Sequence, residues 1–138
     1  MTNQLEFDWL VATYRPLLTV SETQIILHDC SAQHVLNLLD EGRLAGVDIG
    51  NGSVERCVRV WRHAALHAAL KPELPLPVIA TGEILPHHRP TIFQHELARW
   101  CGCAANTVAG WGLAGPRTDR RNVFFREAVI EFLERQKI

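Results

Sequence analysis

Four cysteines and seven histidines are the side chains of this sequence best suited to bind a metal ion or to act as nucleophiles and bases. The cysteines are Cys30, Cys57, Cys101 and Cys103. Only Cys101 and Cys103 are close together, and the single residue between them is fewer than the two to four that usually separate a zinc-chelating pair. Although His87, His88 and His95 lie nearby in the sequence, we predict reduced, mostly buried thiols and no bound metal.

The sequence contains no arrangement typical of a catalytic or nucleotide-binding site. Its histidines do not fall in a His-x-Glu, His-Glu-x-x-His or Cys-x-x-Cys setting. No glycine-rich loop follows a predicted strand, as a phosphate-binding loop would. We therefore predict that the chain is not an enzyme and that it needs no cofactor.

A second group of side chains has chemistry suited to nucleic acid. Asn106 can form two hydrogen bonds with an adenine base, and Thr107 can bond to a base or a phosphate. Arg117, Arg120 and Arg121 place three cations within five residues, and most protein–DNA hydrogen bonds go to the backbone. The structural alternatives are that Asn106 caps its own helix and that the arginines belong to an ordinary solvated loop.

The distribution of charge points to the same region. The net charge of −1 argues against a uniformly basic surface that binds nucleic acid nonspecifically. Residues 1–70 carry eight acidic and five basic side chains, whereas residues 89–138 carry five acidic and eight basic ones. We therefore predict that the C-terminal third makes the phosphate contacts.

The elements that would position these side chains follow one order in each half of the chain. In the N-terminal half we predict a loosely amphipathic helix over 5–14, helices over 19–27 and 32–41, a β-hairpin over 47–60 and a closing helix over 61–70. In the C-terminal half we predict helices over 91–100 and 104–111, a polar loop over 117–122, a short strand over 123–125 and a closing helix over 126–137.

Helix signals include the capping-box spacing from Thr19 to Glu22, Ser31 before the second helix, and Gly42 at its end. The order indicates an internal repeat, with Glu22 matching Glu96 and Val35 matching Val108.

The prolines divide the chain. The segment 72–77 contains three prolines, and a further break lies at 86–90, where Pro86 and Pro90 flank two histidines. Between them, the apolar run over 78–85 is predicted to pack as a strand or a turn of helix. The predicted organisation is a first unit over 1–71, a connector over 72–90 and a second unit over 91–138. The four tryptophans, Trp9, Trp61, Trp100 and Trp111, are predicted to be core residues.

Each half resembles the winged helix-turn-helix of the excisionase and MerR-like group. The match is carried in the second half by residues 96–108, from Glu96 through Ala98 and Gly102 to Val108, and by residues 123–133. In the first half it is carried by residues 18–22 and 41–46, with one extra residue between the first two helices, and Ile26 where a small residue is usual. The resemblance implies a mainly α fold with small β-hairpin wings, built as a tandem winged helix-turn-helix.

The resemblance also implies sites for DNA. Asn106 and Thr107 would read bases from the start of the second helix in the major groove, and the arginines at 117–121 would form a wing on the phosphates. In the first half, Gln33, His34 and Asn37 take the base-reading positions, with Arg56 and Arg59 flanking the wing. The structural alternative places His34 on an ordinary helix surface and both arginines on an ordinary hairpin surface.

The expected function is sequence-specific binding of double-stranded DNA, by a transcriptional regulator or an excisionase-like recombination directionality factor. Two alternatives stay open: a protein–protein adaptor, which the acidic first half favours, and the small DNA-recognising subunit of a phage packaging enzyme. A homodimer or a protein partner is compatible with each. The acidic N-terminus lacks a signal-peptide pattern and no apolar run is long enough to span a membrane, so we expect a cytoplasmic protein.

Overall fold

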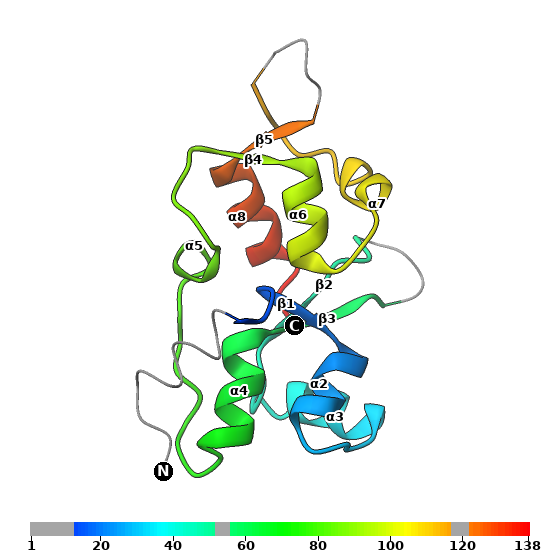
Figure 1. Ribbon diagram of the computed structural model, residues 1–138, viewed down its shortest axis with the longest axis vertical. Coiled ribbons are helices and arrows are strands. Elements are labelled where there is room, and N and C mark those ends of the chain that lie inside the picture. The colour runs from blue at the N-terminus through cyan, green and yellow to red at the C-terminus, as the bar shows by residue number, and fades with distance from the viewer. Residues whose placement is uncertain (1–12, 52–55, 117–121) are drawn as a thin grey trace.

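The computed structural model describes residues 13–51, 56–116 and 122–138, and combines α-helices with two small antiparallel sheets (Figure 1). We call residues 13–71 the first half, 72–90 the connector and 91–138 the second half. The helix predicted over 5–14 lies almost entirely outside the described residues. Within the described ranges, no helix is long and apolar enough to cross a membrane.

The first half contains a three-stranded sheet and three helices. Its elements are β1 (Leu17–Thr19), α2 (Val20–Ile26), α3 (Ala32–Asp40), β2 (Gly46–Asp48), β3 (Val58–Trp61) and α4 (Arg62–Leu70). The strand order is β1-β3-β2, so the predicted hairpin of β2 and β3 is confirmed. Strand β1 was not predicted; it pairs with β3 and makes the sheet three-stranded.

Local capping explains where the helices of the first half begin. The Thr19 side chain accepts a hydrogen bond from the Glu22 backbone N–H, and the Glu22 carboxylate accepts one from the Thr19 N–H at 3.0 Å, which confirms the predicted capping box. The Ser31 hydroxyl likewise accepts from the His34 N–H and starts α3. Gly42 follows α3 with a φ of 74°, a left-handed conformation that glycine adopts without strain.

The second half repeats this order and differs from the prediction in its first element. Its elements are β4 (Thr91–Phe93), α6 (Gln94–Cys101), α7 (Ala105–Ala109), β5 (Val123–Phe125) and α8 (Arg126–Arg135). Residues 91–93 were predicted to be helical, but they form a strand because they pair with β5. The strand that pairs with β5 is therefore β4, and the loop of the predicted wing, residues 117–121, lies outside the described residues. The connector contributes one helical turn, α5 (Thr81–Ile84).

Backbone hydrogen bonds recur at matching positions in the two halves. The N–H of Arg62 donates to the carbonyl of Pro16, and the N–H of Arg126 donates to the carbonyl of Pro90, each at 2.9 Å. The N–H of Trp61 donates to Ala45, and that of Phe125 donates to Ala114, again at 2.9 Å. Each accepting alanine is followed by a glycine, Gly46 or Gly115, where a Cβ atom would collide with a carbonyl oxygen of the facing strand. The recurrence fixes Arg62 and Arg126 as equivalent residues.

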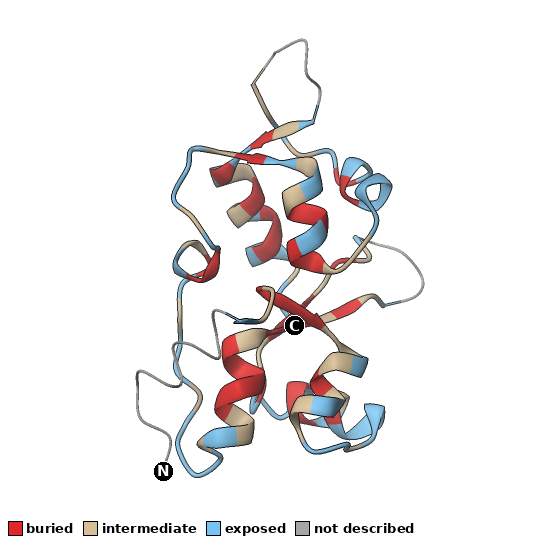
Figure 2. Cartoon of the chain, in the orientation of Figure 1, coloured by how far each residue is buried: buried red, intermediate tan, exposed pale blue. Residues whose placement is uncertain are grey.

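The two halves stack in layers, with the first sheet between the helices of the first half and those of the second half (Figure 1). The chain end after α8 completes this contact, because the Asp48 N–H donates to the Gln136 carbonyl at 2.9 Å and the Ile138 N–H donates to the Gly46 carbonyl at 3.0 Å. Buried residues, red in Figure 2, lie along the helices and strands of both halves and form one core cluster. Trp61, Trp100 and Trp111 belong to this core, as predicted, whereas Trp9 lies outside the described residues.

A buried histidine makes the stability of the fold sensitive to mild acid. The His63 side chain in α4 is 6% exposed, and its Nδ1 has no hydrogen-bond partner in the described part of the chain. Burial, reinforced by the charges of Arg62 and His67, lowers the pKa of His63 to about 4. Because the unfolded chain binds a proton at the ordinary pKa of about 6.5, protonation favours unfolding. The stabilisation is complete above pH 6.5 and is lost as the pH falls towards 4.

We expect the free energy of unfolding to fall by about 2 kcal/mol between pH 6.5 and 5, at roughly 1.4 kcal/mol per pH unit. Urea titrations across this range measure the slope. His63→Leu should flatten it, whereas His88→Leu, a change at an exposed histidine, should leave it as in the wild type. Equal slopes for the wild type and His63→Leu would show that another group controls acid sensitivity.

Candidate nucleic-acid interface

The start of α7 presents two unpaired polar side chains. Ala104, with extended backbone dihedral angles, is the N-cap of α7, so Asn106 lies inside the helix at its second position and does not cap it. Both Asn106 and Thr107 are exposed. Neither side chain hydrogen-bonds to another residue in the described ranges, which leaves their donors and acceptors available to a ligand. The interpretation of Asn106 as a capping residue is therefore excluded.

Helix α6 holds α7 in place. Gly102 ends α6 in the left-handed conformation, with a φ of 62°, and the Cys103 N–H donates back to the Ala98 carbonyl at 3.1 Å. The Gln94 side-chain amide donates to the Ala105 carbonyl at 2.8 Å. Val108 is completely buried beneath the exposed pair. The short helix is thereby fixed at its first turn, where the polar side chains are located.

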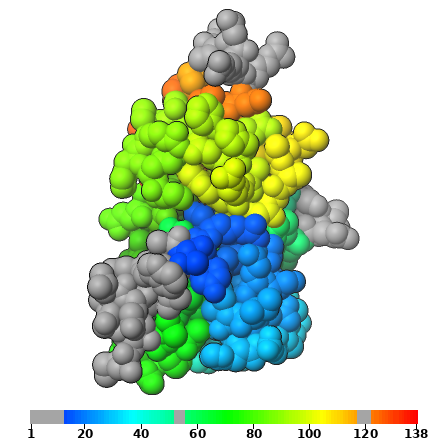
Figure 3. Space-filling view, in the orientation of Figure 1, coloured from blue at the N-terminus to red at the C-terminus, as the bar shows by residue number. Residues whose placement is uncertain are grey.

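A groove brings the first hairpin next to α7. Its lining comes from both halves: Ile49, Gly50, Asn51, Arg56, Cys57, Asn106, Thr107, Gly110 and Trp111. Arg56 is exposed and makes no ion pair within the described part of the chain. The structure therefore places the Arg56 cation along one groove with the hydrogen-bonding side chains of Asn106 and Thr107, although about fifty residues separate Arg56 from Asn106 in the sequence. In the space-filling view, α7 (yellow) lies on the same flank of the molecule as the visible part of the first hairpin (Figure 3).

The predicted residues of the first half separate into two groups. Gln33 and Asn37 are exposed on α3 one turn apart, and the Gln33 amide donates to the Asn37 Oδ1 at 2.9 Å. His34 is exposed on the same helix but lines a different hollow, which lies between α3 and the end of α4. Arg56 also borders a second groove with Ser21 and Leu36, beside α2 and α3. It therefore lies between the two halves and is shared by both candidate surfaces.

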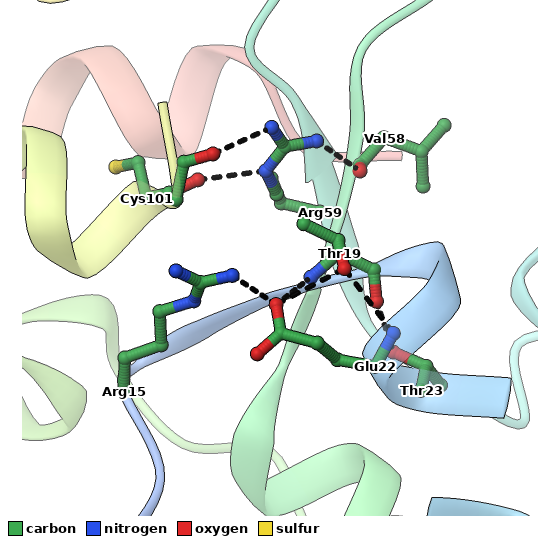
Figure 4. A network of polar contacts seen from close by, with 8 residues as sticks. Arg15, Thr19, Glu22, Thr23, Val58, Arg59 and Cys101 are labelled. Carbon is green, nitrogen blue, oxygen red and sulfur yellow. Dashed lines mark hydrogen bonds and ion pairs between the residues drawn. The ribbon is translucent and has the colours of Figure 1, made fainter. Parts of the chain in front are cut away.

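Several arginines that raise the basic count hold the fold together. Arg59, which was predicted to flank the first wing, donates from Nε to the Cys101 carbonyl at 2.7 Å and from Nη2 to the Gly102 carbonyl at 2.9 Å (Figure 4). Arg62 donates to Tyr14 and Ile84 carbonyls, and Arg126 donates to the carbonyls of His87 and Gly82. Charge counting therefore overstated the number of cations that can reach a phosphate. Arg117, Arg120 and Arg121 lie outside the described residues.

An arginine–glutamate ion pair supports the start of the first helix in each half. Arg15 contacts Glu22 and Arg89 contacts Glu96. Burial alone would raise the pKa of each glutamate, but hydrogen bonds from the N-cap backbone and the arginine outweigh it and lower the pKa. An Arg-Pro pair precedes each glutamate at the same spacing, and this repeat could have predicted both ion pairs from the sequence.

The sulfur atoms do not gather into a metal site. Cys101 is completely buried, and burial raises the pKa of its thiol; the pKa of the half-buried Cys103 thiol is raised for the same reason. Among the described residues, no group of three or more histidine, cysteine, aspartate or glutamate side chains could hold a metal ion. Buried thiols of this kind are unreactive.

Comparison of the chain with protein-family models, with curated proteins and with solved structures finds no match. The site must therefore be interpreted from its own geometry.

Proposed function

We propose that this chain binds double-stranded DNA in a sequence-dependent manner through a tandem winged helix-turn-helix, as a transcriptional regulator or an excisionase-like factor. One observation carries the proposal: Asn106 and Thr107 are exposed on a braced short helix, in a groove that also contains Arg56, and none of the three side chains has a partner among the described residues. An amide side chain can discriminate adenine in the major groove, while an arginine beside it can contact the phosphate backbone. The chain would have no catalytic role in this function.

In this proposal each half supplies a different kind of contact. Asn106 and Thr107 supply the base contacts, Arg56 supplies a phosphate contact from the first hairpin, and the arginines at 117–121 supply the wing contacts expected from the sequence. Gln33 and Asn37 form a second, weaker reading surface, because their side chains already bond to each other. His34 faces another hollow and has no part in this surface.

Arg56→Ala tests the composite groove. We expect it to weaken binding to specific and random duplexes by a similar factor and to reduce the slope of log K against log salt concentration by about one, because one phosphate contact is lost. Mobility shifts at a series of salt concentrations measure both quantities. Arg135→Ala, at an exposed arginine outside the groove, is the matched control and should bind as the wild type does.

The adaptor function predicts a different outcome. If the acidic first half serves a protein partner, the wild type should fail to bind DNA at every salt concentration. Neither Arg56→Ala nor Arg135→Ala should then change this result. If instead Arg56→Ala leaves the salt slope unchanged while the wild type binds DNA normally, the first hairpin does not take part in binding.

A further inference from the structure

Within the described part of the chain, the layered arrangement leaves the outer face of the second sheet uncovered. Because side chains alternate across a strand, Thr91, Phe93, Val123 and Phe125 share the face opposite to the buried Ile92 and Phe124. Phe93 is 38% exposed and Phe125 is 44% exposed. The Phe93 ring is held by stacking on His95 at 5.6 Å and by the Arg89 guanidinium at 5.8 Å. We call these four residues the aromatic face.

The corresponding face of the first sheet is covered by the second half. Its equivalent positions are occupied by Leu17, Thr19, Arg59 and Trp61; Leu17 is 1% exposed and Trp61 is 3% exposed. Arg59 reaches from this face to the end of α6, and the chain end after α8 pairs with β2 at its edge. The helix ends of the second half therefore pack on the sheet of the first half, whereas nothing in the described part of the chain covers the aromatic face.

The opposite end of the molecule contains a cleft that could receive the aromatic face. A cleft of about 840 Å³ lies between α3, α4 and the connector, and its lining combines the apolar Leu38, Ala68, Ala69 and Leu74 with polar side chains that include His34 and Arg43. Counting from the equivalent Arg62 and Arg126, the two alanines correspond to Phe132 and Leu133, and Leu74 corresponds to Ile138.

The corresponding end of the second half is filled and covered. Trp111, the counterpart of Leu38, stacks on Phe132 with ring centroids 4.5 Å apart, and it also borders the first hairpin. Residues 136–138 pair there with β2. In the first half the small alanines leave a hollow at the same place, and Leu74 at its edge is 56% exposed.

We propose that the aromatic face of one copy binds the α3–α4 cleft of a second copy and so repeats, between chains, the contact that joins the two halves within one chain. Two phenylalanine rings would fill the space that Phe132 and Leu133 occupy in the second half, and a buried aromatic side chain removes about 150–250 Å² from water. The two surfaces are different, so the association is head to tail and leaves one free surface at each end. This self-association goes beyond DNA binding and requires no nucleic acid.

Two surface variants distinguish this arrangement from other modes of association. Phe125→Glu disables the aromatic face and keeps the cleft, whereas Leu74→Glu disables the cleft and keeps the face. By sedimentation equilibrium without DNA, the average mass of the wild type should rise above 15.6 kDa with concentration. Each variant alone should stay monomeric, and an equimolar mixture of the two should form a dimer through the remaining intact pair of surfaces.

Val78→Glu is the matched control, because Val78 is 98% exposed and belongs to neither surface. It should associate as the wild type does. Far-UV circular dichroism checks folding, and Phe93→Ser replaces Phe125→Glu if that variant unfolds. A wild type that stays at 15.6 kDa, or a mixture of the two variants that stays monomeric, overturns the proposal. Neither result bears on DNA binding, which is measured separately.

Discussion

Replacing Asn106 by alanine is expected to weaken binding to the preferred DNA sequence by about 1–3 kcal/mol and to change binding to random duplex DNA very little. The asymmetry has a physical reason. A paired amide distinguishes one base from another, whereas phosphate contacts are the same on every sequence. Asn106 is suited to this role because it is exposed, lies in the first turn of α7 and does not cap that helix.

Competition mobility shifts, with specific and random duplexes measured side by side, give the two affinities. Arg135→Ala, at an exposed residue of α8 outside the groove, is the control and should preserve the preference. An equal loss on both duplexes would assign Asn106 a structural role. If Asn106→Ala binds normally while Gln33→Ala or Asn37→Ala abolishes the preference, α3 is the reading helix and our assignment of the halves is reversed.

Arg59→Met is expected to lower the free energy of unfolding by about 2–4 kcal/mol, because it leaves partly buried carbonyls without a charged donor. The guanidinium bonds to the carbonyls of Val58, Cys101 and Gly102. Cys101 and Gly102 lie at the C-terminal end of α6, where a positive charge also interacts favourably with the helix dipole. Methionine keeps most of the apolar stem, so the loss measures the polar contacts.

Urea unfolding at neutral pH measures this loss, and Arg56→Met is a matched control three residues earlier in the chain. Because Arg56 is exposed, its replacement should change stability by no more than about 0.5 kcal/mol. The two arginines should therefore show opposite behaviour, with Arg56 affecting DNA binding and Arg59 affecting stability. A wild-type free energy of unfolding for Arg59→Met would mean that the halves do not depend on this contact.

Features fixed by neighbouring residues could be predicted from the sequence. The capping box of Thr19 and Glu22, the N-cap Ser31 and the helix end at Gly42 each depend on residues within one helical turn, and each is confirmed. The hairpin of β2 and β3 was also predicted, because its strands flank a short turn-forming segment.

Features fixed by distant residues could not be predicted. Residues 91–93 looked like the start of a helix, but they pair with a strand that lies about thirty residues later. Arg56 and Asn106 lie along the same groove because of how the two halves stack, and no local sequence pattern encodes this stacking. Charge counting could not separate Arg59, which bonds internally, from Arg56, which is exposed.

Selection of bound sequences from a pool of random duplexes tests the central claim most directly. The account predicts that the wild type enriches one short motif and that Asn106→Ala loses the preference at one adenine-containing position while keeping the rest of the motif. A pool that remains random after repeated selection, with no retained DNA even at low salt, would contradict it.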